Sequence, residues 1–579
     1  MQDYTLFQKF IIEDTPVGEH KIIIYQVFTR LFGNKQQNQV KNGSLIENGV
    51  GKFADFDEKA LGAIKDLGIT HIWYTGVLEH ATMTDYSDYG ISVDHPQVVK
   101  GRAGSPYAIK DYYDVNPDLA LEVTNRMQEF EQLVARTHQQ GLKVIIDFVP
   151  NHVARHYASD AKPAGVVDLG AGDDQRKPFD PNNNFYWFQD QEFKVPEGYE
   201  PPVKSSQPYR EVPAKATGNN VFRADPSIHD WFETVKLNYG VDYTNQDKIN
   251  FDPVPDTWHK MKDILVFWTN KGVDGFRCDM AEMVPVEFWQ WVIPQVKQVN
   301  PEILFIAEIY NPARYRDYIE QGKFDYLYDK VQLYDTIRHI MEGKSQNTAG
   351  ISDIIRDLKG IHPYLLRFQE NHDEQRIASS FFAGDAQKGL PAMAINSLVH
   401  SGPVMVYFGQ EVGEPGMQEE GFSGEDGRTT IFDYWGVPEH QKWMNGGEFD
   451  GGGLSQEQKT LRENYRKLLH YAANQPLIMN GKLLDNSALQ RNLGEPLPEA
   501  IYAFTRFGEE KAVLVVTNFS DQPEKVKLRL PIKIFTENTF GKWMEWDGNE
   551  AQASREEDFV VVETEVGGWS FVMVDSPPS

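Results

Sequence analysis

Four short segments of the chain carry acidic, histidine and arginine side chains directly after runs of β-prone residues. They span residues 147–152, 275–279, 305–308 and 368–373. Among them are the carboxylates Asp279, Glu308 and Asp373. Cleavage of a glycosidic bond with retention of configuration needs two carboxyl groups about 5–5.5 Å apart, one as nucleophile and one as proton donor. These segments therefore indicate acid/base and nucleophilic chemistry, and cleavage of a glycosidic bond is one reaction of this kind.

Arg277 precedes Asp279 by two residues, so the two side chains lie on one side of a β-strand. Its fixed positive charge is expected to keep the Asp279 carboxylate ionised at neutral pH, and Arg277 is also counted among the substrate-binding candidates. The proton donor must instead hold a proton, so we expect Glu308 to have the higher pKa of the two. An isolated aspartate is more often a helix cap or a surface charge, but four ordered motifs at strand ends favour one shared site.

Eight β-prone runs alternate with amphipathic helical stretches between residues 21 and 412, the pattern of βα units around a parallel sheet. Eight such units close a TIM barrel, whose functional side chains project from the carboxyl ends of the strands. The predicted covering helices include residues 58–67, 122–140 and 256–270, the last with Asp256 as its N-cap. The predicted strands are residues 21–27, 69–74, 143–148, 273–278, 303–309, 324–327, 364–368 and 404–408.

The chain is predicted to be an α/β protein in three parts. Residues 1–150 and 251–478 form the TIM (β/α)8 barrel, and residues 151–250 form a subdomain inserted after the third strand, because this stretch is too long and too rich in turn residues for an ordinary loop. Residues 479–579 form a C-terminal antiparallel β-sandwich. Its predicted strands are residues 500–505, 511–517, 524–530, 559–563 and 569–574.

The four motifs resemble, in order and on the expected strands, the signature regions of glycoside hydrolase family 13, the α-amylase family. Two further segments agree with this resemblance, residues 68–73 and residues 402–411. The resemblance implies an enzyme that cleaves α-glucosidic bonds of starch, maltooligosaccharides or related glucans through a covalent glucosyl intermediate. It assigns Asp279 as nucleophile, Glu308 as general acid/base and Asp373 as the group that stabilises the transition state. It also implies that His152 and His372 donate hydrogen bonds to hydroxyls of the same glucose.

Aromatic residues are candidates for stacking against glucose rings. Tyr107 resembles the family tyrosine that stacks under the cleaved glucose, and Tyr89 is the competing candidate. The aromatic run at residues 185–188 could form further glucose platforms or simply the core of the inserted subdomain. Both interpretations of that run stay open at the level of the sequence.

A structural calcium ion is a second expectation from the resemblance. Asn151 matches the family asparagine that often binds calcium between the barrel and the insertion, and calcium prefers the hard oxygen ligands that Asp168, Asp173 or Asp174 could add. Alternatively, Asn151 braces the loop of His152 by hydrogen bonds, and the acidic residues are solvated.

Several alternatives concern the substrate. Residues 236–238, Lys-Leu-Asn, resemble a motif of neopullulanases and cyclomaltodextrinases, which predicts action on α-1,6 as well as α-1,4 bonds. Glu282 and Met283 stand where many α-amylases have Lys-His, so contacts beyond the cleaved bond are open. A transglycosylase would use the same residues. A non-catalytic glucan-binding protein is disfavoured because all three carboxylates are present.

Composition restricts the partners. The 85 acidic residues against 57 Lys and Arg give a net charge of −28, which would repel nucleic acid and anionic membranes. No run approaches the roughly 18 apolar residues of a membrane helix. The single cysteine, Cys278, excludes an intramolecular disulfide. We expect a periplasmic or extracellular location, where polymeric glucan is met, and leave the oligomeric state open.

Overall fold

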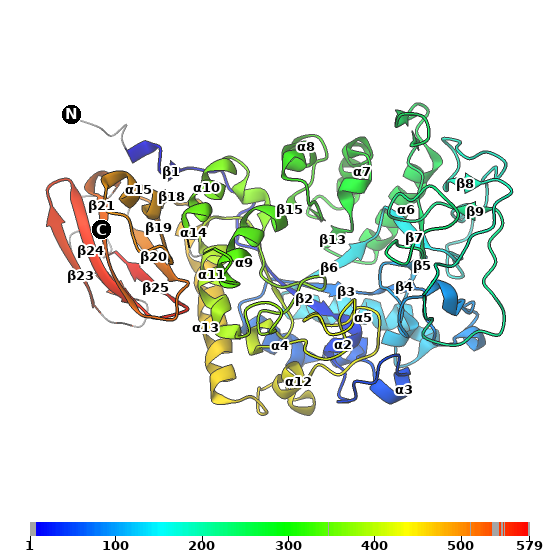
Figure 1. The fold of residues 1–579 in the computed structure, drawn as a ribbon, viewed down its shortest axis with the longest axis horizontal. Helices are drawn as coiled ribbons and strands as arrows, with labels where there is room; N and C mark the ends of the chain where they lie inside the picture. Colours follow the sequence, from blue (N-terminus) through cyan, green and yellow to red (C-terminus); the bar gives the residue numbers. More distant parts are fainter. Residues whose placement is uncertain are drawn as a thin grey trace.

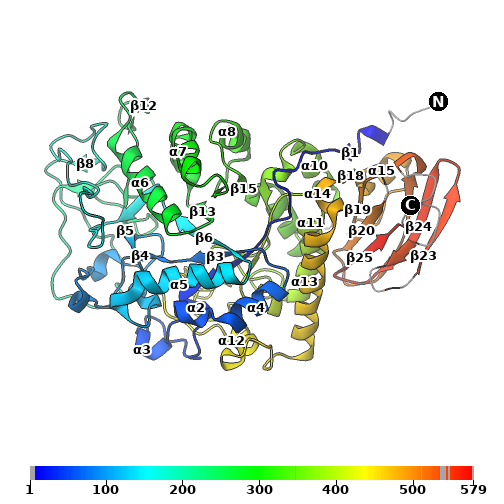
Figure 2. The same ribbon diagram turned by 180° about the vertical axis from the view of Figure 1, so that it is seen from behind.

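The computed structural model describes residues 7–345, 347–509, 511–534, 543–545, 548 and 550–576. A parallel barrel with its covering helices occupies one end of the elongated molecule, and a β-sheet domain occupies the other (Figure 1). The long helix α13, Gln456–Asn474, runs between the two (Figure 2). No helix among the described residues is both long and apolar enough to cross a bilayer.

All eight predicted barrel strands are present and pair in parallel. In spatial order the sheet contains β16 (Leu365–Leu366), β15 (Tyr326–Tyr328), β14 (Leu304–Ala307), β13 (Gly275–Cys278), β6 (Lys143–Phe148), β3 (His71–Thr75), β2 (Ile23–Phe28) and β17 (Val404–Tyr407). A bridge between Arg367 and Val404 closes the barrel. Its interior is filled by buried side chains such as Ile24, Ile145 and Met405, so the barrel is a packed core.

The predicted covering helices are also present. They include α4 (Glu58–Asp66), α5 (Arg126–Gln139), α6 (Asp256–Asn270), α7 (Val286–Val299) and α11 (Gly389–Leu398). The expected cap of α6 is wrong by one residue, because Pro255 occupies the N-cap position and Asp256 lies in the first turn. There the Asp256 carboxylate pairs with Lys260 at 2.9 Å instead of accepting from the helix backbone.

The segment inserted after β6 contains only short strands. β7 (His152–Ala154) pairs with β10 (Thr234–Lys236), β8 (Trp187–Phe188) with β9 (Ala214–Lys215), and β11 (Val241–Asp242) with β12 (Lys248–Ile249). The aromatic residues Phe185, Tyr186 and Trp187 are at most 6% exposed. This run therefore forms a local core rather than glucose platforms.

The C-terminal region is the predicted antiparallel sandwich. Its sheet contains, among others, β19 (Ile501–Phe507), β20 (Ala512–Asn518), β21 (Glu524–Pro531), β24 (Phe559–Val566) and β25 (Ser570–Asp575). One edge strand was not expected: β1 (Ile11–Ile12) pairs antiparallel with β18 (Lys482–Asp485). These N-terminal residues, assigned to the barrel from the sequence, thus extend the C-terminal sheet, because Leu483 and Leu484 offer a free strand edge to them.

Candidate active site

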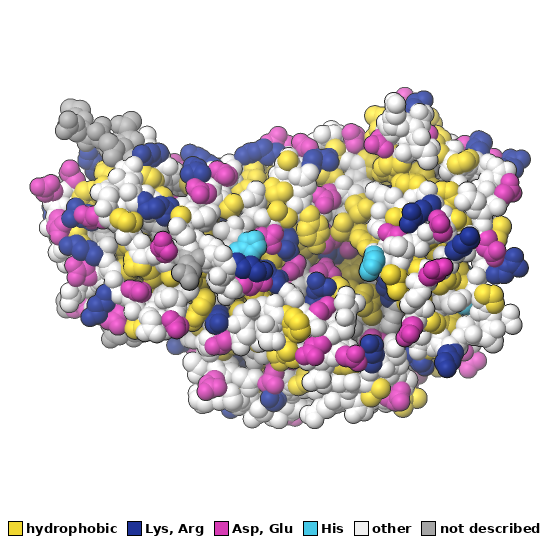
Figure 3. All heavy atoms as spheres, viewed as in Figure 1, with side chains coloured by type: hydrophobic (Ala, Val, Ile, Leu, Met, Phe, Trp, Pro, Cys, Tyr) yellow, Lys and Arg dark blue, Asp and Glu magenta, His cyan; other side chains and the backbone are white. Residues whose placement is uncertain are grey.

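A pocket of about 520 Å³ opens at the carboxyl ends of the barrel strands. Its lining includes Asp279, Glu308, Asp373, Tyr107 and His152, each of which lies in the segment after a different barrel strand. The face seen in Figure 3 is hollowed near its middle, where Figure 1 labels β13, and acidic side chains are visible in the hollow. The structure therefore brings together the side chains that the separate sequence motifs predicted.

Arg277 lies beneath the pocket and contacts three carboxylates. Its Nη1 atom is 2.8 Å from Oδ1 of Asp279 and 3.3 Å from Oδ1 of Asp147, and its Nη2 atom is 2.8 Å from Oε2 of Glu308. The strand register explains this arrangement, because Arg277 on β13 is the partner of Asp147 on β6. With 1% of its side chain exposed, Arg277 binds the carboxylates rather than lining the pocket as a substrate-binding residue.

The carboxylate of Glu308 is held from two further directions. The backbone N–H of Met280 donates to its Oε2 atom at 2.7 Å, and the hydroxyl of Tyr310 donates to its Oε1 atom at 2.8 Å. Met280 adopts a positive φ of 43°, which is unfavourable for a non-glycine residue and turns its N–H toward Glu308. Local backbone strain thus contributes to the position of the expected proton donor.

Tyr107 and His372 form a buried layer beside the carboxylates. The Tyr107 hydroxyl lies 2.5 Å from Nε2 of His372 and 3.4 Å from Oδ1 of Asp147. Trp73 donates to the other Asp147 oxygen at 3.0 Å. Tyr107 lines the pocket, whereas Tyr89 is 48% exposed, so the structure favours Tyr107 of the two candidates.

Asp373 faces the pocket from the loop after β16. Its Oδ2 atom lies 3.0 Å from Nε2 of His372. Burial raises the pKa of Asp373, but the charges of His372, Arg277 and Arg428 outweigh burial and lower it below its usual value. Asp373 is therefore ionised at neutral pH, as required for a group that stabilises positive charge on a sugar.

The charge of Asp279 differs from the sequence expectation. Burial first, and then the neighbouring Glu308 carboxylate, raise the pKa of Asp279 well above its usual value, and Arg277 only opposes this. The prediction that Arg277 keeps Asp279 ionised was therefore incomplete, because it neglected the cost of burying several carboxylates together.

His152 approaches the same carboxylate from the inserted segment. Its Nε2 atom is 4.0 Å from Oδ2 of Asp279, an oxygen with no hydrogen-bond partner in the described part of the chain. Burial and then Lys236 lower the pKa of His152 to about 3, so the ring is neutral. The amide of Asn151 donates to Nδ1 at 3.1 Å, which leaves the hydrogen on Nε2, facing the pocket.

Asn151 does not fit the expected calcium site. Its side-chain oxygen accepts a hydrogen bond from the ammonium of Lys236, and its amide donates to the Gly218 carbonyl at 2.8 Å. Lys236 is buried, so its side-chain nitrogen already lies against the one oxygen that would bind calcium. The bracing interpretation of Asn151 is the one that these contacts support.

The acidic residues suggested beside Asn151 have other partners. Asp168 accepts from the backbone N–H of Ser159 at 3.1 Å and pairs with Lys162 at 3.3 Å. Asp173 accepts from the backbone of Asn184 and Phe185 and from Trp187, while Asp174 pairs with Arg176 at 2.8 Å. Asn238 of the Lys-Leu-Asn segment donates to the carbonyls of Asp180 and Asn183, both at 2.8 Å. Residues 236–238 therefore stabilise the inserted segment and are not among the residues that line the pocket.

Several residues of the site were not singled out from the sequence. Trp231 and His229 line the pocket from the inserted segment, and Phe422 and Phe432 line it from the loop after β17. No local pattern marks them, since long loops bring them to the barrel. Tyr310 and Asp147 could have been found, because Tyr310 follows Glu308 by two residues and Asp147 opens the first motif.

Comparison with known proteins agrees with this geometry. A model of the alpha-amylase catalytic domain matches residues 26–468, which include every residue of the pocket. The chain belongs to the alpha-amylase family of glycoside hydrolases. The family expected from the four motifs is confirmed.

Similar proteins differ in their named activities. Alpha-amylase 3 of Dictyoglomus thermophilum is 22% identical over 88% of this chain and 91% of its own length. Neopullulanase 2 of Thermoactinomyces vulgaris is 21% identical over 91% and 74%, and a 4-alpha-glucanotransferase of Thermotoga maritima is 24% identical over 69% and 74%. The structure of a maltogenic alpha-amylase from Thermotoga neapolitana aligns with a TM-score of 0.59 at 20% identity, covering 96% of this chain and 98% of that chain. At this identity the structural likeness shows the shared fold.

Proposed function

We propose that this protein hydrolyses α-1,4-glucosidic bonds of starch-type glucans, and that it retains the anomeric configuration. The observation that supports this most directly is the shared guanidinium, which donates to Asp279 and forms an ion pair with Glu308, both at 2.8 Å. Among the described residues, no donor occupies Oδ2 of Asp279. A free carboxylate oxygen beside a second carboxyl group is the arrangement that a double displacement needs.

In the proposed reaction, Oδ2 of Asp279 attacks the anomeric carbon while Glu308 protonates the leaving glycosidic oxygen. This forms a covalent glucosyl ester on Asp279. Glu308, now ionised, then takes a proton from water, which attacks the same carbon and releases Asp279. Asp373 and His152 would bind hydroxyls of the glucose that is cleaved, and Tyr107 would stack against its ring. His372 supports Tyr107 and Asp373 from behind.

The decisive experiment combines one variant with product stereochemistry. Asp279→Asn should lower kcat by on the order of 10⁴-fold or more with the fold intact. Proton NMR of the first products of the wild-type enzyme should show the α-anomer. Initial β-anomer would exclude a double displacement, and near wild-type turnover of Asp279→Asn would remove Asp279 as the nucleophile.

Two finer features are part of the proposal. Aromatic residues on the pocket rim, Trp231, Phe422 and Phe432, could hold a second sugar as acceptor, which supports some transfer to glucan alongside hydrolysis. The resemblance at residues 236–238, together with the neopullulanase relative, supports cleavage of α-1,6 bonds as well. Incubation with amylose, pullulan and cyclodextrin, with products separated by size, tests both features.

We also propose a periplasmic or extracellular location for the protein, which cell fractionation tests.

A further inference from the structure

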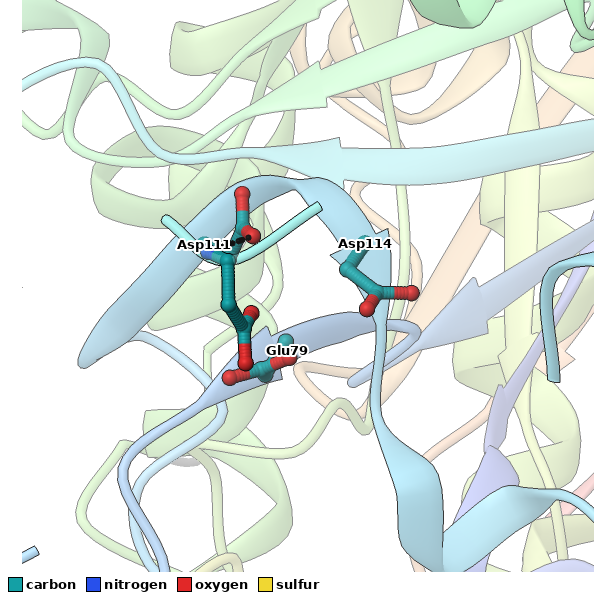
Figure 4. A group of neighbouring side chains, drawn as sticks. Glu79, Asp111 and Asp114 are labelled. Carbon is teal, nitrogen blue, oxygen red and sulfur yellow. Dashed lines mark hydrogen bonds between the residues drawn. The ribbon is translucent and has the colours of Figure 1, made fainter. Parts of the chain in front are cut away.

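A second cluster of carboxylates lies away from the pocket, on the hairpin of β4 (Leu78–His80) and β5 (Ile109–Val115). Glu79 on β4 is the direct cross-strand partner of Asp111 on β5, and Asp114 follows on the same strand. Asp160 joins them from the inserted segment, and one oxygen of each of the four groups lies within 4.8 Å of the others. Figure 4 shows Glu79, Asp111 and Asp114 gathered around one small space. Like charges directly opposite each other destabilise a strand pair, so the arrangement calls for a compensating partner.

Glu79 is the member of the cluster without any such partner. The residue is 1% exposed, and neither of its carboxylate oxygens has a hydrogen-bond partner in the described part of the chain. A buried polar group in this state costs free energy, and a buried ion costs far more unless it is paired. Its carboxyl group points toward the oxygens of Asp111 and Asp114.

The other carboxylates are held firmly in place. Asp111 accepts hydrogen bonds from the backbone of Asp160 and Ala161, both at 2.9 Å, and from the Ser159 hydroxyl at 2.6 Å. Asp114 accepts from Nε of Arg126 at 2.8 Å. A carboxylate has about four lone-pair positions, and Asp111 uses all four, since the N–H of Tyr113 also donates to its Oδ1 atom at 2.8 Å. A cation here would therefore share the oxygens of Asp111 with these donors. Asp114 accepts twice from Arg126 at Oδ2 and once from the N–H of Val115 at Oδ1, so its Oδ1 atom keeps one free position. Two fixed anions and one unpartnered acid thus face one another.

We propose that Glu79, Asp111, Asp114 and Asp160 bind a calcium ion. Calcium takes six to eight oxygen ligands at 2.3–2.6 Å, so oxygens on opposite sides of the ion are about 5 Å apart. The separation within the cluster, at most 4.8 Å, matches that span. Magnesium fits less well, because it demands shorter bonds in a near-octahedral arrangement and keeps several waters. The exposed position of Asp160 leaves a side of the site open to water ligands.

The site would join three parts of the molecule that serve the pocket. β4 and β5 follow the barrel strand β3, and the loop at residues 159–161 belongs to the inserted segment that carries Trp231. Tyr107 lies two residues before the start of β5. Calcium bound here would fix the inserted segment against the hairpin, and this location differs from the one expected at Asn151.

The test uses the full-length protein, stripped with a chelator and desalted. Titration calorimetry with calcium chloride should show one tight site, and the melting temperature should rise with calcium and much less with magnesium. Glu79→Gln keeps the size of the side chain and removes its charge, so it should weaken calcium binding by a factor of ten or more. Asp174→Asn, a change of the same kind at an acidic residue paired with Arg176, should bind calcium like the wild type.

Two results would overturn the proposal. One is a stripped wild-type protein that binds no calcium and melts at the same temperature with and without it. The other is Glu79→Gln with unchanged calcium affinity. If Glu79→Gln fails to fold, the wild-type titration alone decides the question.

Discussion

At the scale of single residues, charge balance dominates the site. Arg277 contacts Asp147, Asp279 and Glu308. Burial lowers the pKa of Arg277, but Glu308, Tyr328, Tyr107 and Asp279 outweigh burial and raise this pKa well above its usual value. One terminal nitrogen of its planar guanidinium group contacts Asp279, and the other contacts Glu308. A lysine ammonium has the same charge but cannot reach both groups in this way. The position of the charge, and not only its sign, therefore matters.

The first prediction concerns the guanidinium group of Arg277. Arg277→Lys should lower kcat by about 10²-fold, comparable with the loss of one preorganised hydrogen-bond donor in other enzymes. Steady-state kinetics on a maltooligosaccharide measures the effect, and circular dichroism checks that the fold is retained. Unchanged kcat would show that the two carboxylates do not depend on a shared guanidinium.

The second prediction concerns Lys236, which takes the place of the expected calcium. Burial lowers its pKa to about 7, whereas the unfolded chain has the usual value of 10.5. Between these values the unfolded state binds more protons than the folded state, so this residue makes stability rise with pH, by up to about 1.4 kcal/mol per pH unit. Below pH 7 both states are protonated, and the full cost of burying the charge remains.

Lys236→Met isolates this contribution. Denaturant midpoints of the wild type and the variant, compared from pH 6 to pH 10, should diverge in favour of the wild type as the pH rises above 7. A difference that does not change with pH would contradict the assignment. Buried groups away from Lys236 are the same in both proteins, so they cancel in the comparison. His152, whose pKa Lys236 lowers, titrates near pH 3 in the wild type, below the compared range.

At the scale of elements, loops decide which side chains reach the pocket. The segment between β4 and β5 delivers Tyr107, and Gly104 lets it pass close to the backbone of Ala81. Gly104 has a φ of +76°, and a Cβ atom there would lie 1.7 Å from the Ala81 carbonyl oxygen. A left-handed backbone and this close approach both require glycine. The path of the loop is therefore fixed by a residue that makes no contact with substrate.

The third prediction follows from this loop. Gly104→Ala should destabilise the protein by roughly 1–3 kcal/mol and lower activity, because Tyr107 shifts with the loop. Gly62→Ala is a matched control, since Gly62 lies inside α4 with nothing within 4 Å of the added atom. It should instead stabilise by about 0.5–1 kcal/mol. Thermal melts and activity of both variants provide the measurement, and equal effects would contradict the argument.

At the scale of the whole molecule, the barrel and the C-terminal sandwich share one core. Tyr502, Phe504, Val513 and Val515 belong to the same buried cluster as the barrel helices, and α11 packs against β20 and β25. Arg506 donates to the Val399 carbonyl at 3.1 Å, across the boundary between the two domains. An interface of this kind couples the unfolding of both parts.

The fourth prediction tests this coupling. Phe504→Ala should cost about 3–5 kcal/mol and lower the melting temperature of the whole chain, including the temperature at which activity is lost. Met544→Ala, at a side chain that is 40% exposed in the same sandwich, should change little. Calorimetry together with residual activity after heating measures both. Loss of the sandwich transition with unchanged heat inactivation would show that the barrel folds independently.

The sequence by itself determined the barrel, the sandwich and the carboxylates of the pocket. These features are encoded locally: alternation along a strand places Arg277 beside Asp279, and the barrel brings successive strand ends to one face. Contacts between distant segments were decided only by the tertiary structure. They include the hydrogen bond from Lys236 to Asn151 and the cross-strand pair of Glu79 and Asp111. They also include the pairing of β1 with the C-terminal sheet and the aromatic residues that line the pocket from long loops. In each case the packing of long loops and of domains determines which residues meet. Burial then shifts the pKa values of these residues. Neither effect can be predicted from a local pattern in the sequence.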